Sequence, residues 1–222
     1  MRRRGFITLL GGAAAWPIAA FAQQRLPRIG VLLYGRAVPS GDLQIAAELA
    51  RIGYVEGRNI AYEIRGAEGD ITRLPPLARE LVAARPEVLV GSTAQIAVAL
   101  FNATREIPIV ITMVSDPIVL GLSTSISRPT RNVTGFTISS LSLAAKRLEI
   151  LHEVVPASSK VAYLWAPQNP SAAFYKSRVQ QAAVALGIKL VSLPLTSEAD
   201  IVGAFARVDE EQVTAVLTEA HA

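Results

Sequence analysis

The chain has no cysteine among its 222 residues and only two histidines. Without cysteine it forms no disulfide, offers no thiolate to a metal, and lacks the lipid-bearing cysteine that tethers some exported proteins to a membrane. The histidines, His152 and His221, do not cluster with carboxylates, so no metal and no cofactor is expected. His152 lies beside Glu153 in an amphipathic segment, where a solvated position on a helix face is favoured over a catalytic base or a ligand.

Several sequence motifs of enzymes are also absent. The chain contains no Gly-x-Gly-x-x-Gly, no Gly-x-x-x-x-Gly-Lys-Ser/Thr, no His-Glu-x-x-His and no Gly-x-Ser-x-Gly, so dinucleotide, P-loop, zinc-hydrolase and serine-hydrolase functions have no support. The net charge of +4 includes Arg2, Arg3 and Arg4, which leaves +1 for residues 23–222. This small excess gives no reason to expect nucleic-acid binding. The composition therefore argues against an enzyme.

The first 22 residues follow the order of a bacterial export signal. A twin arginine, Arg3-Arg4, precedes a mostly apolar run at 9–20 and the small-x-small sequence Ala20-Phe21-Ala22. The apolar run is shorter than the roughly 20 residues that a membrane-spanning helix needs. We expect cleavage after Ala22 and a soluble periplasmic protein exported by the twin-arginine route. The general secretory route and a buried N-terminal helix are the alternatives.

The rest of the chain alternates apolar runs typical of buried strands with amphipathic segments typical of helices. The expected strands are 28–33, 59–64, 88–90, 109–112, 133–136, 161–165, 189–193 and 214–217. The expected helices are 42–52, 73–84, 95–103, 141–155, 171–186 and one capped by Ser197 that runs to about 207. Such alternation predicts an α/β fold with parallel sheets. A Ser/Thr-rich stretch at 137–140 predicts a hinge between two lobes, 27–138 and 139–222.

Four loops that follow strands carry small polar residues. They are Tyr34-Gly35, Gly91-Ser92-Thr93, Ser115-Asp116-Pro117 and Asn169-Pro170-Ser171. In parallel α/β sheets, ligands bind beyond the carboxyl ends of the strands, near the free N–H groups of the following helices.

Each of these candidates has a structural alternative. Ser92 and Thr93 are candidates for binding an anionic group, or for capping a helix. Asp116 is a candidate partner for an ammonium group, or a cap for its own turn. Tyr34 and Trp165 offer stacking faces, although packing in the core or at its rim is the more common role of such aromatic residues.

Several segments of the chain resemble solute-binding proteins of ABC transporters, in the group that includes aromatic-amino-acid binders. These segments are RRRGFITLLGGAAAWP, IGYVEGRNIAYE, IPIVITMVSDPIVLGL, SRPTRNVTGFT, LAAKRLEILHEVVP and NPSAAFY. The resemblance implies a type I periplasmic-binding fold, in which two Rossmann-like lobes close on a small solute by hinge motion. It also implies a monomer without catalytic activity that delivers its ligand to ABC permease subunits. A sensory or chemotaxis protein of the same fold and an exported α/β enzyme are the alternatives.

The resemblance also implies a set of ligand-binding residues. They are Tyr34, Ser92, Thr93, Ser115 and Asp116 from the first lobe, and Asn169 and Ser171 from the second. Hydroxyl groups and a carboxylate suit an amino acid or a related carboxylate. Relatives continue well past the strand at 214–217, so we expect an incomplete second lobe with an open edge and an uncovered face. A non-functional truncated fragment is therefore a further alternative.

Overall fold

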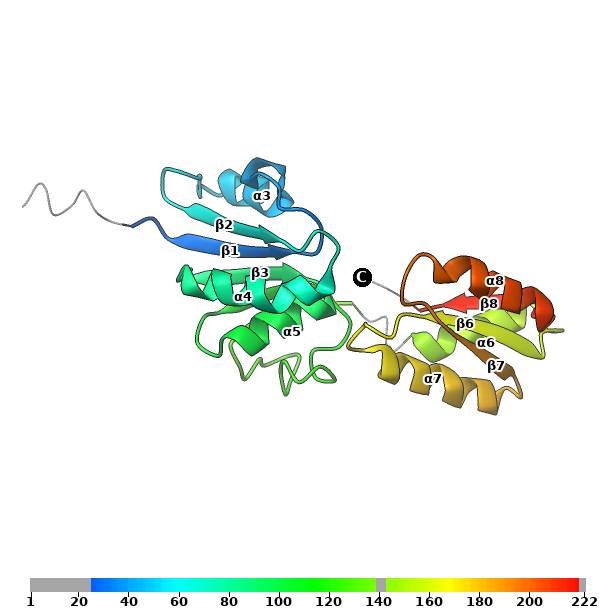
Figure 1. Ribbon diagram of the computed structural model, residues 1–222. Coiled ribbons are helices and arrows are strands. Elements are labelled where there is room, and N and C mark those ends of the chain that lie inside the picture. Colours follow the sequence, from blue (N-terminus) through cyan, green and yellow to red (C-terminus); the bar gives the residue numbers. More distant parts are fainter. Residues whose placement is uncertain (1–24, 139–142, 220–222) are drawn as a thin grey trace, which may run out of the picture.

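The computed structural model describes residues 25–138 and 143–219, which form two α/β lobes placed side by side (Figure 1). The expected export signal, His221 and the residues 139–140 of the expected hinge lie outside the described residues. Within the described ranges, no helix is both long enough and apolar enough to cross a membrane.

The first lobe is built on a parallel five-stranded sheet. Its strand order is β2-β1-β3-β4-β5. The strands are β1 (Arg28–Leu33), β2 (Ala61–Gly66), β3 (Val88–Ser92), β4 (Ile109–Val114) and β5 (Val133–Thr137). The sequence RIGVLL of β1 is apolar on both faces, as expected for a strand inside a parallel sheet.

Two helices, α4 (Leu74–Ala83) and α5 (Ala94–Ala103), cover one face of this sheet. Their apolar residues form a core with alternate residues of the strands, among them Leu32, Leu89 and Ile109, each with no exposed area. The other face carries Val90, Val110 and Phe136 by register, and Phe136 is 77% exposed.

Helix α3 (Gln44–Arg51) follows a 3-10 turn, η2 (Ser40–Asp42), where the sequence predicts one helix over 42–52. Its apolar side chains lie on one face as expected, but none of its residues is buried. The reason is that η2 is its main neighbour among the described elements. Gly53 ends the helix with a φ of +95°, a conformation that glycine adopts without strain.

The second lobe contains a parallel three-stranded sheet in the order β7-β6-β8. The strands are β6 (Lys160–Trp165), β7 (Lys189–Pro194) and β8 (Ala215–Thr218). Helices α6 (Ala144–Val154) and α7 (Ala172–Ala185) pack on one face, and α8 (Asp200–Glu210) packs on the other. In the described part of the chain, β8 pairs on one side only, with β6.

The expected strands and helices are confirmed to within a few residues at their ends, but the expected cap of α8 is wrong. The Ser197 side chain makes no cap at this helix. Instead, the Asp200 carboxylate accepts hydrogen bonds from the Thr196 hydroxyl and from the backbone N–H groups of Thr196 and Ser197. These bonds, the Thr196 hydroxyl first, hold the pKa of the Asp200 carboxyl below its ordinary value. Ser197 therefore acts as a hydrogen-bond donor to Asp200 and not as the cap of α8.

Candidate ligand-binding cleft

The carboxyl ends of both sheets face the gap between the lobes (Figure 1). In the first sheet, β2 lies on one side of β1 and β3 lies on the other. The chain therefore reverses its winding direction at β1. Such reversal points are where α/β sheets bind ligands. Tyr34, Ser92 and Ser115 lie at the ends of the neighbouring strands β1, β3 and β4. The sequence-predicted residues of the first lobe therefore share one edge.

A cavity of about 460 Å³ lies between the lobes. From the first lobe it is lined by Tyr34 and by Gly69, Asp70 and Ile71, and from the second lobe by Pro167, Gln168 and Thr196. Its size falls within the range of small-molecule sites in proteins. Of the seven residues predicted from sequence, Tyr34 lines this cavity, and its side chain is 46% exposed.

A close approach of two backbone segments positions Tyr34. The loop after β1 passes directly over Gly66 at the end of β2, and a Cβ atom on Gly66 would lie 2.1 Å from the Ala37 nitrogen. Only glycine fits such a contact. The Tyr34 carbonyl then accepts a hydrogen bond of 2.8 Å from the Gly69 N–H. These contacts fix the Tyr34 backbone at the mouth of the cleft.

Asp70 is an acidic residue of the cavity that the sequence argument did not select. Its carboxylate accepts bonds of 2.7 Å from the Thr72 hydroxyl and 2.9 Å from the Thr72 N–H. These two bonds, the hydroxyl first, hold the pKa of Asp70 below its ordinary value. The cavity therefore has an ionised carboxylate on its wall at neutral pH.

The Ser92-Thr93 turn shows the capping geometry that the sequence left as an alternative. Thr93 is the N-cap of α5, and its hydroxyl accepts a bond of 3.4 Å from the Ile96 N–H. Its φ of +111° is rare for a residue with a branched side chain and is often found at functional sites. The turn also presents the N-terminal end of α5 to the edge where Ser92 lies.

Asp116 likewise caps its own turn. One of its carboxylate oxygens, Oδ1, accepts bonds of 2.9 Å from the Ile118 N–H and 3.1 Å from the Val119 N–H. No bond is found for its second oxygen among the described residues. Asp116 therefore has a structural role at its own turn.

Ser115 and Ser171 meet across the cleft. Their hydroxyl oxygens lie 3.3 Å apart, which joins the end of β4 to the start of α7. Val119, from the loop after β4, also packs against the core of the second lobe. The residues after β4 therefore contact both lobes, and Ser115 and Ser171 are the two predicted residues that touch each other across the gap.

Asn169 is buried, and its polar atoms are bound within the second lobe. Its Nδ2 donates to the Glu219 carboxylate, and its Oδ1 accepts a bond of 3.0 Å from the Ser171 N–H. Glu219 also accepts a bond of 3.1 Å from the Ala166 N–H and is only 5% exposed. Sequence reasoning missed Glu219, although its position just after β8 marks it by the same rule that selected the other loops.

Two residues discussed in the sequence analysis have mainly packing environments. The Trp165 ring packs against the core of the second lobe, its Nε1 donates to the Ser192 hydroxyl at 2.9 Å, and Lys176 lies 4.6 Å from the ring centre. His152 is half-buried and not simply solvated, because α6 turns it partly inward. Its Nδ1 atom is buried without a hydrogen-bond partner.

Two lobes with parallel sheets, whose carboxyl edges line a shared cleft, define a type I periplasmic-binding fold. Solved structures of similar shape support this class. A conserved domain protein from Vibrio cholerae O1 biovar El Tor superposes with a TM-score of 0.73 at 28% identity, covering 86% of this chain and 64% of its own. An ABC domain in complex with L-Trp from Streptococcus pneumoniae gives a TM-score of 0.72 at 23% identity, covering 87% and 65%.

The chain belongs to the family of ABC transporter substrate binding proteins, whose model matches residues 41–221. A tyrosine-binding protein of Clostridioides difficile (strain R20291) is 32% identical over 113 residues, which are 51% of this chain and 32% of the relative. The chain thus spans about a third of that relative and 64–65% of the two solved chains. The family is one of binding proteins and not of enzymes.

Proposed function

We propose that the chain binds a small solute, an amino acid or a related carboxylate, in the cleft between its lobes. The observation that carries this proposal is the cavity of about 460 Å³ with walls from both lobes. A ligand that contacts both walls stabilises the closed arrangement, since it gains contacts that the open arrangement does not offer. We further propose that the protein works in the periplasm and delivers this solute to ABC permease subunits.

The chemistry of the cleft supports a zwitterionic ligand with a planar side chain. The Tyr34 ring offers a stacking face, and the N-terminus of α5 beside Ser92 favours an anionic group such as an α-carboxylate. The free oxygen of Asp116 suits an α-ammonium group. The tyrosine-binding relative from Clostridioides difficile agrees with an aromatic amino acid.

Thermal unfolding of the purified protein with each of the twenty amino acids tests this proposal. Ligand at 100 times its dissociation constant adds about 2.7 kcal/mol to the free energy of unfolding. We expect one chemical class, the aromatic amino acids, to raise the melting temperature. A cooperative transition that no amino acid shifts would count against the proposed ligand class.

The variant Asp116→Asn separates the charge of Asp116 from its capping role. Asparagine keeps an Oδ1 acceptor for the Ile118 and Val119 N–H groups but carries no charge. We expect the melting temperature without ligand to change little, while the affinity for the amino acid falls by about 2 kcal/mol, or roughly 30-fold. Isothermal titration calorimetry measures this loss. Unchanged affinity would assign Asp116 to the turn alone.

A further inference from the structure

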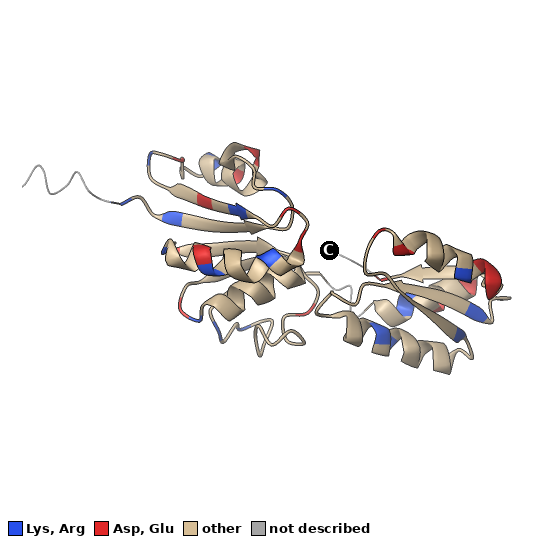
Figure 2. Cartoon of the chain, in the orientation of Figure 1, with Lys and Arg blue, Asp and Glu red and all other residues tan. Residues whose placement is uncertain are grey.

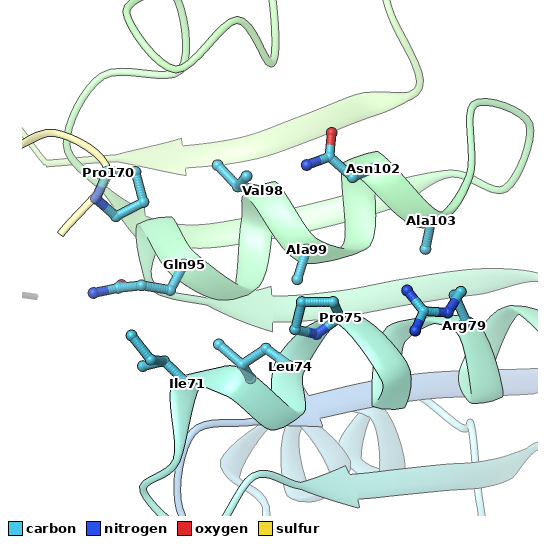
Figure 3. A pocket seen from close by; sticks show the side chains of 10 residues that line it. All are labelled: Ile71, Leu74, Pro75, Arg79, Gln95, Val98, Ala99, Asn102, Ala103 and Pro170. Atoms are coloured by element: carbon cyan, nitrogen blue, oxygen red, sulfur yellow. The ribbon is translucent and has the colours of Figure 1, made fainter. Parts of the chain in front are cut away.

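A second cavity lies beside the cleft, between α4 and α5. Its volume is about 310 Å³. The walls are mostly apolar, with Ile71, Leu74 and Pro75 on one side and Val98, Ala99 and Ala103 on the other, and the polar residues Gln95 and Asn102 of α5 also line the cavity. In Figure 3, Ala99 of α5 faces Leu74 and Pro75 of α4 across the gap between the two helices. We call this cavity the α4–α5 groove.

One cation reaches into the α4–α5 groove. Arg79 lines it and extends from α4 toward α5, near Ala103 (Figure 3). Arg79 is exposed and has no ion-pair or hydrogen-bond partner among the described residues. The nearby arginine Arg65, by contrast, pairs with Glu63 at 2.7 Å and with Glu80 at 3.2 Å. Figure 2 shows both charge signs along α4. The guanidinium of Arg79 is therefore free to bind an anionic group.

The opposite end of the groove is apolar and comes from the second lobe. Pro170 lies there, beyond Gln95 at the start of α5 (Figure 3). From Gln95 to Ala103, a helical rise of 1.5 Å per residue makes the groove about 12 Å long. A mostly apolar groove of this length with a cation at one end suits a linear molecule with a carboxylate head and an aliphatic tail.

We propose that the α4–α5 groove binds a medium-chain monocarboxylate, with its carboxylate on Arg79 and its tail lying toward Ile71 and Pro170. The groove adjoins the cleft cavity, because Ile71 lines both, but Arg79 and the α5 residues line the groove alone. Burial of the tail against Ile71, Pro75 and Val98, which are not fully buried, supplies the affinity. The pair with Arg79 supplies the preference for an anion over a neutral head group.

Isothermal titration calorimetry of the purified protein with octanoate tests the proposal. Octanamide is the neutral probe of the same length. We expect saturable binding of one octanoate, with octanamide weaker by on the order of fivefold, since one exposed charge pair is lost. Arg79→Gln should reduce octanoate affinity by a similar factor and remove the preference over octanamide. Arg58→Gln is the matched control, because Arg58 is an exposed arginine of the same lobe outside the groove.

A second variant tests the apolar wall without touching the charge. Ala103→Leu places a larger side chain in the groove on a helix that tolerates leucine, so octanoate and octanamide should both bind at least several-fold more weakly. An unchanged melting temperature in each variant shows that the fold is intact. The proposal is overturned if octanoate does not bind saturably, or if Arg79→Gln or Ala103→Leu binds it as the unmodified protein does.

Discussion

Glu219 holds the loop between β6 and α7 in place, and its removal provides a direct test of how the cleft is built. Its carboxylate accepts hydrogen bonds from the Asn169 side chain and from the Ala166 N–H. Asn169 cannot compensate by rotating its amide, because its Oδ1 already accepts from the Ser171 N–H. Glu219→Ala therefore leaves a buried donor of Asn169 and a half-buried donor of Ala166 without an acceptor.

The expected cost follows from these two donors. Leaving a buried donor unsatisfied costs about 1–3 kcal/mol, so Glu219→Ala should lower the free energy of unfolding by about 2–4 kcal/mol. Glu219→Gln keeps one oxygen acceptor but turns an N–H toward a donor, so it should cost roughly half as much. Urea unfolding followed by far-UV circular dichroism measures both values by linear extrapolation.

The matched control is Glu198→Ala. Glu198 is an exposed acidic residue in the same lobe, and we expect this change to stay within about 0.5 kcal/mol of the unmodified protein. If Glu219→Ala also stays within that range, the carboxylate does not organise the loop, and the argument for the buried network is refuted.

Three further predictions concern the backbone, the pH dependence and the stacking face. Gly66→Ala should lower the free energy of unfolding, measured in urea, by about 1–3 kcal/mol or more, because the new Cβ would overlap backbone atoms. Gly41→Ala is the control and should cost far less, because a Cβ there meets no atom within 4 Å. The folded state holds the pKa of Asp200 below its ordinary value of 3.8, so ionised Asp200 stabilises the fold above pH 3.8. This contribution is lost as the pH falls through the lowered pKa. Asp200→Asn should therefore flatten the curve of melting temperature against pH in this acidic range. Tyr34→Ala should weaken amino-acid binding by about tenfold in calorimetry, while Tyr34→Phe keeps the ring and the affinity; equal losses in both would assign the role to the hydroxyl.

Most of the fold can be predicted from the sequence because apolar runs typical of strands alternate with amphipathic segments typical of helices. The run RIGVLL is apolar without alternation, and the structure places β1 at the expected residues 28–33. Helix ends are harder to predict, since they depend on which polar group reaches a free N–H first. At α8 no side chain caps the helix, and the Asp200 carboxylate instead binds the N–H groups of Thr196 and Ser197, which precede the helix.

The candidate site could be predicted as an edge of the sheet but not as a set of contacts. The rule that ligands bind beyond strand ends places Tyr34, Ser92 and Ser115 together, because β1, β3 and β4 are neighbours in the sheet. It does not reveal that the loop after β2 contributes Asp70 to the cavity. Nor does it reveal that the carboxylate after β8 binds Asn169, since this pairing depends on how three loops of the second lobe fold together.

The hydrogen bonds divide the predicted residues into two kinds. Asn169 and Thr93 use polar atoms to hold their own turns, so substitutions there act first on loop geometry. Asp116 also holds its turn, but Asp116→Asn keeps the Oδ1 acceptor and changes only the charge. Tyr34 lines the cavity with its ring, so a substitution there acts on the ligand itself. A loss of affinity without loss of stability is therefore the signature of direct contact, whereas a joint loss of both indicates a residue that positions the cleft.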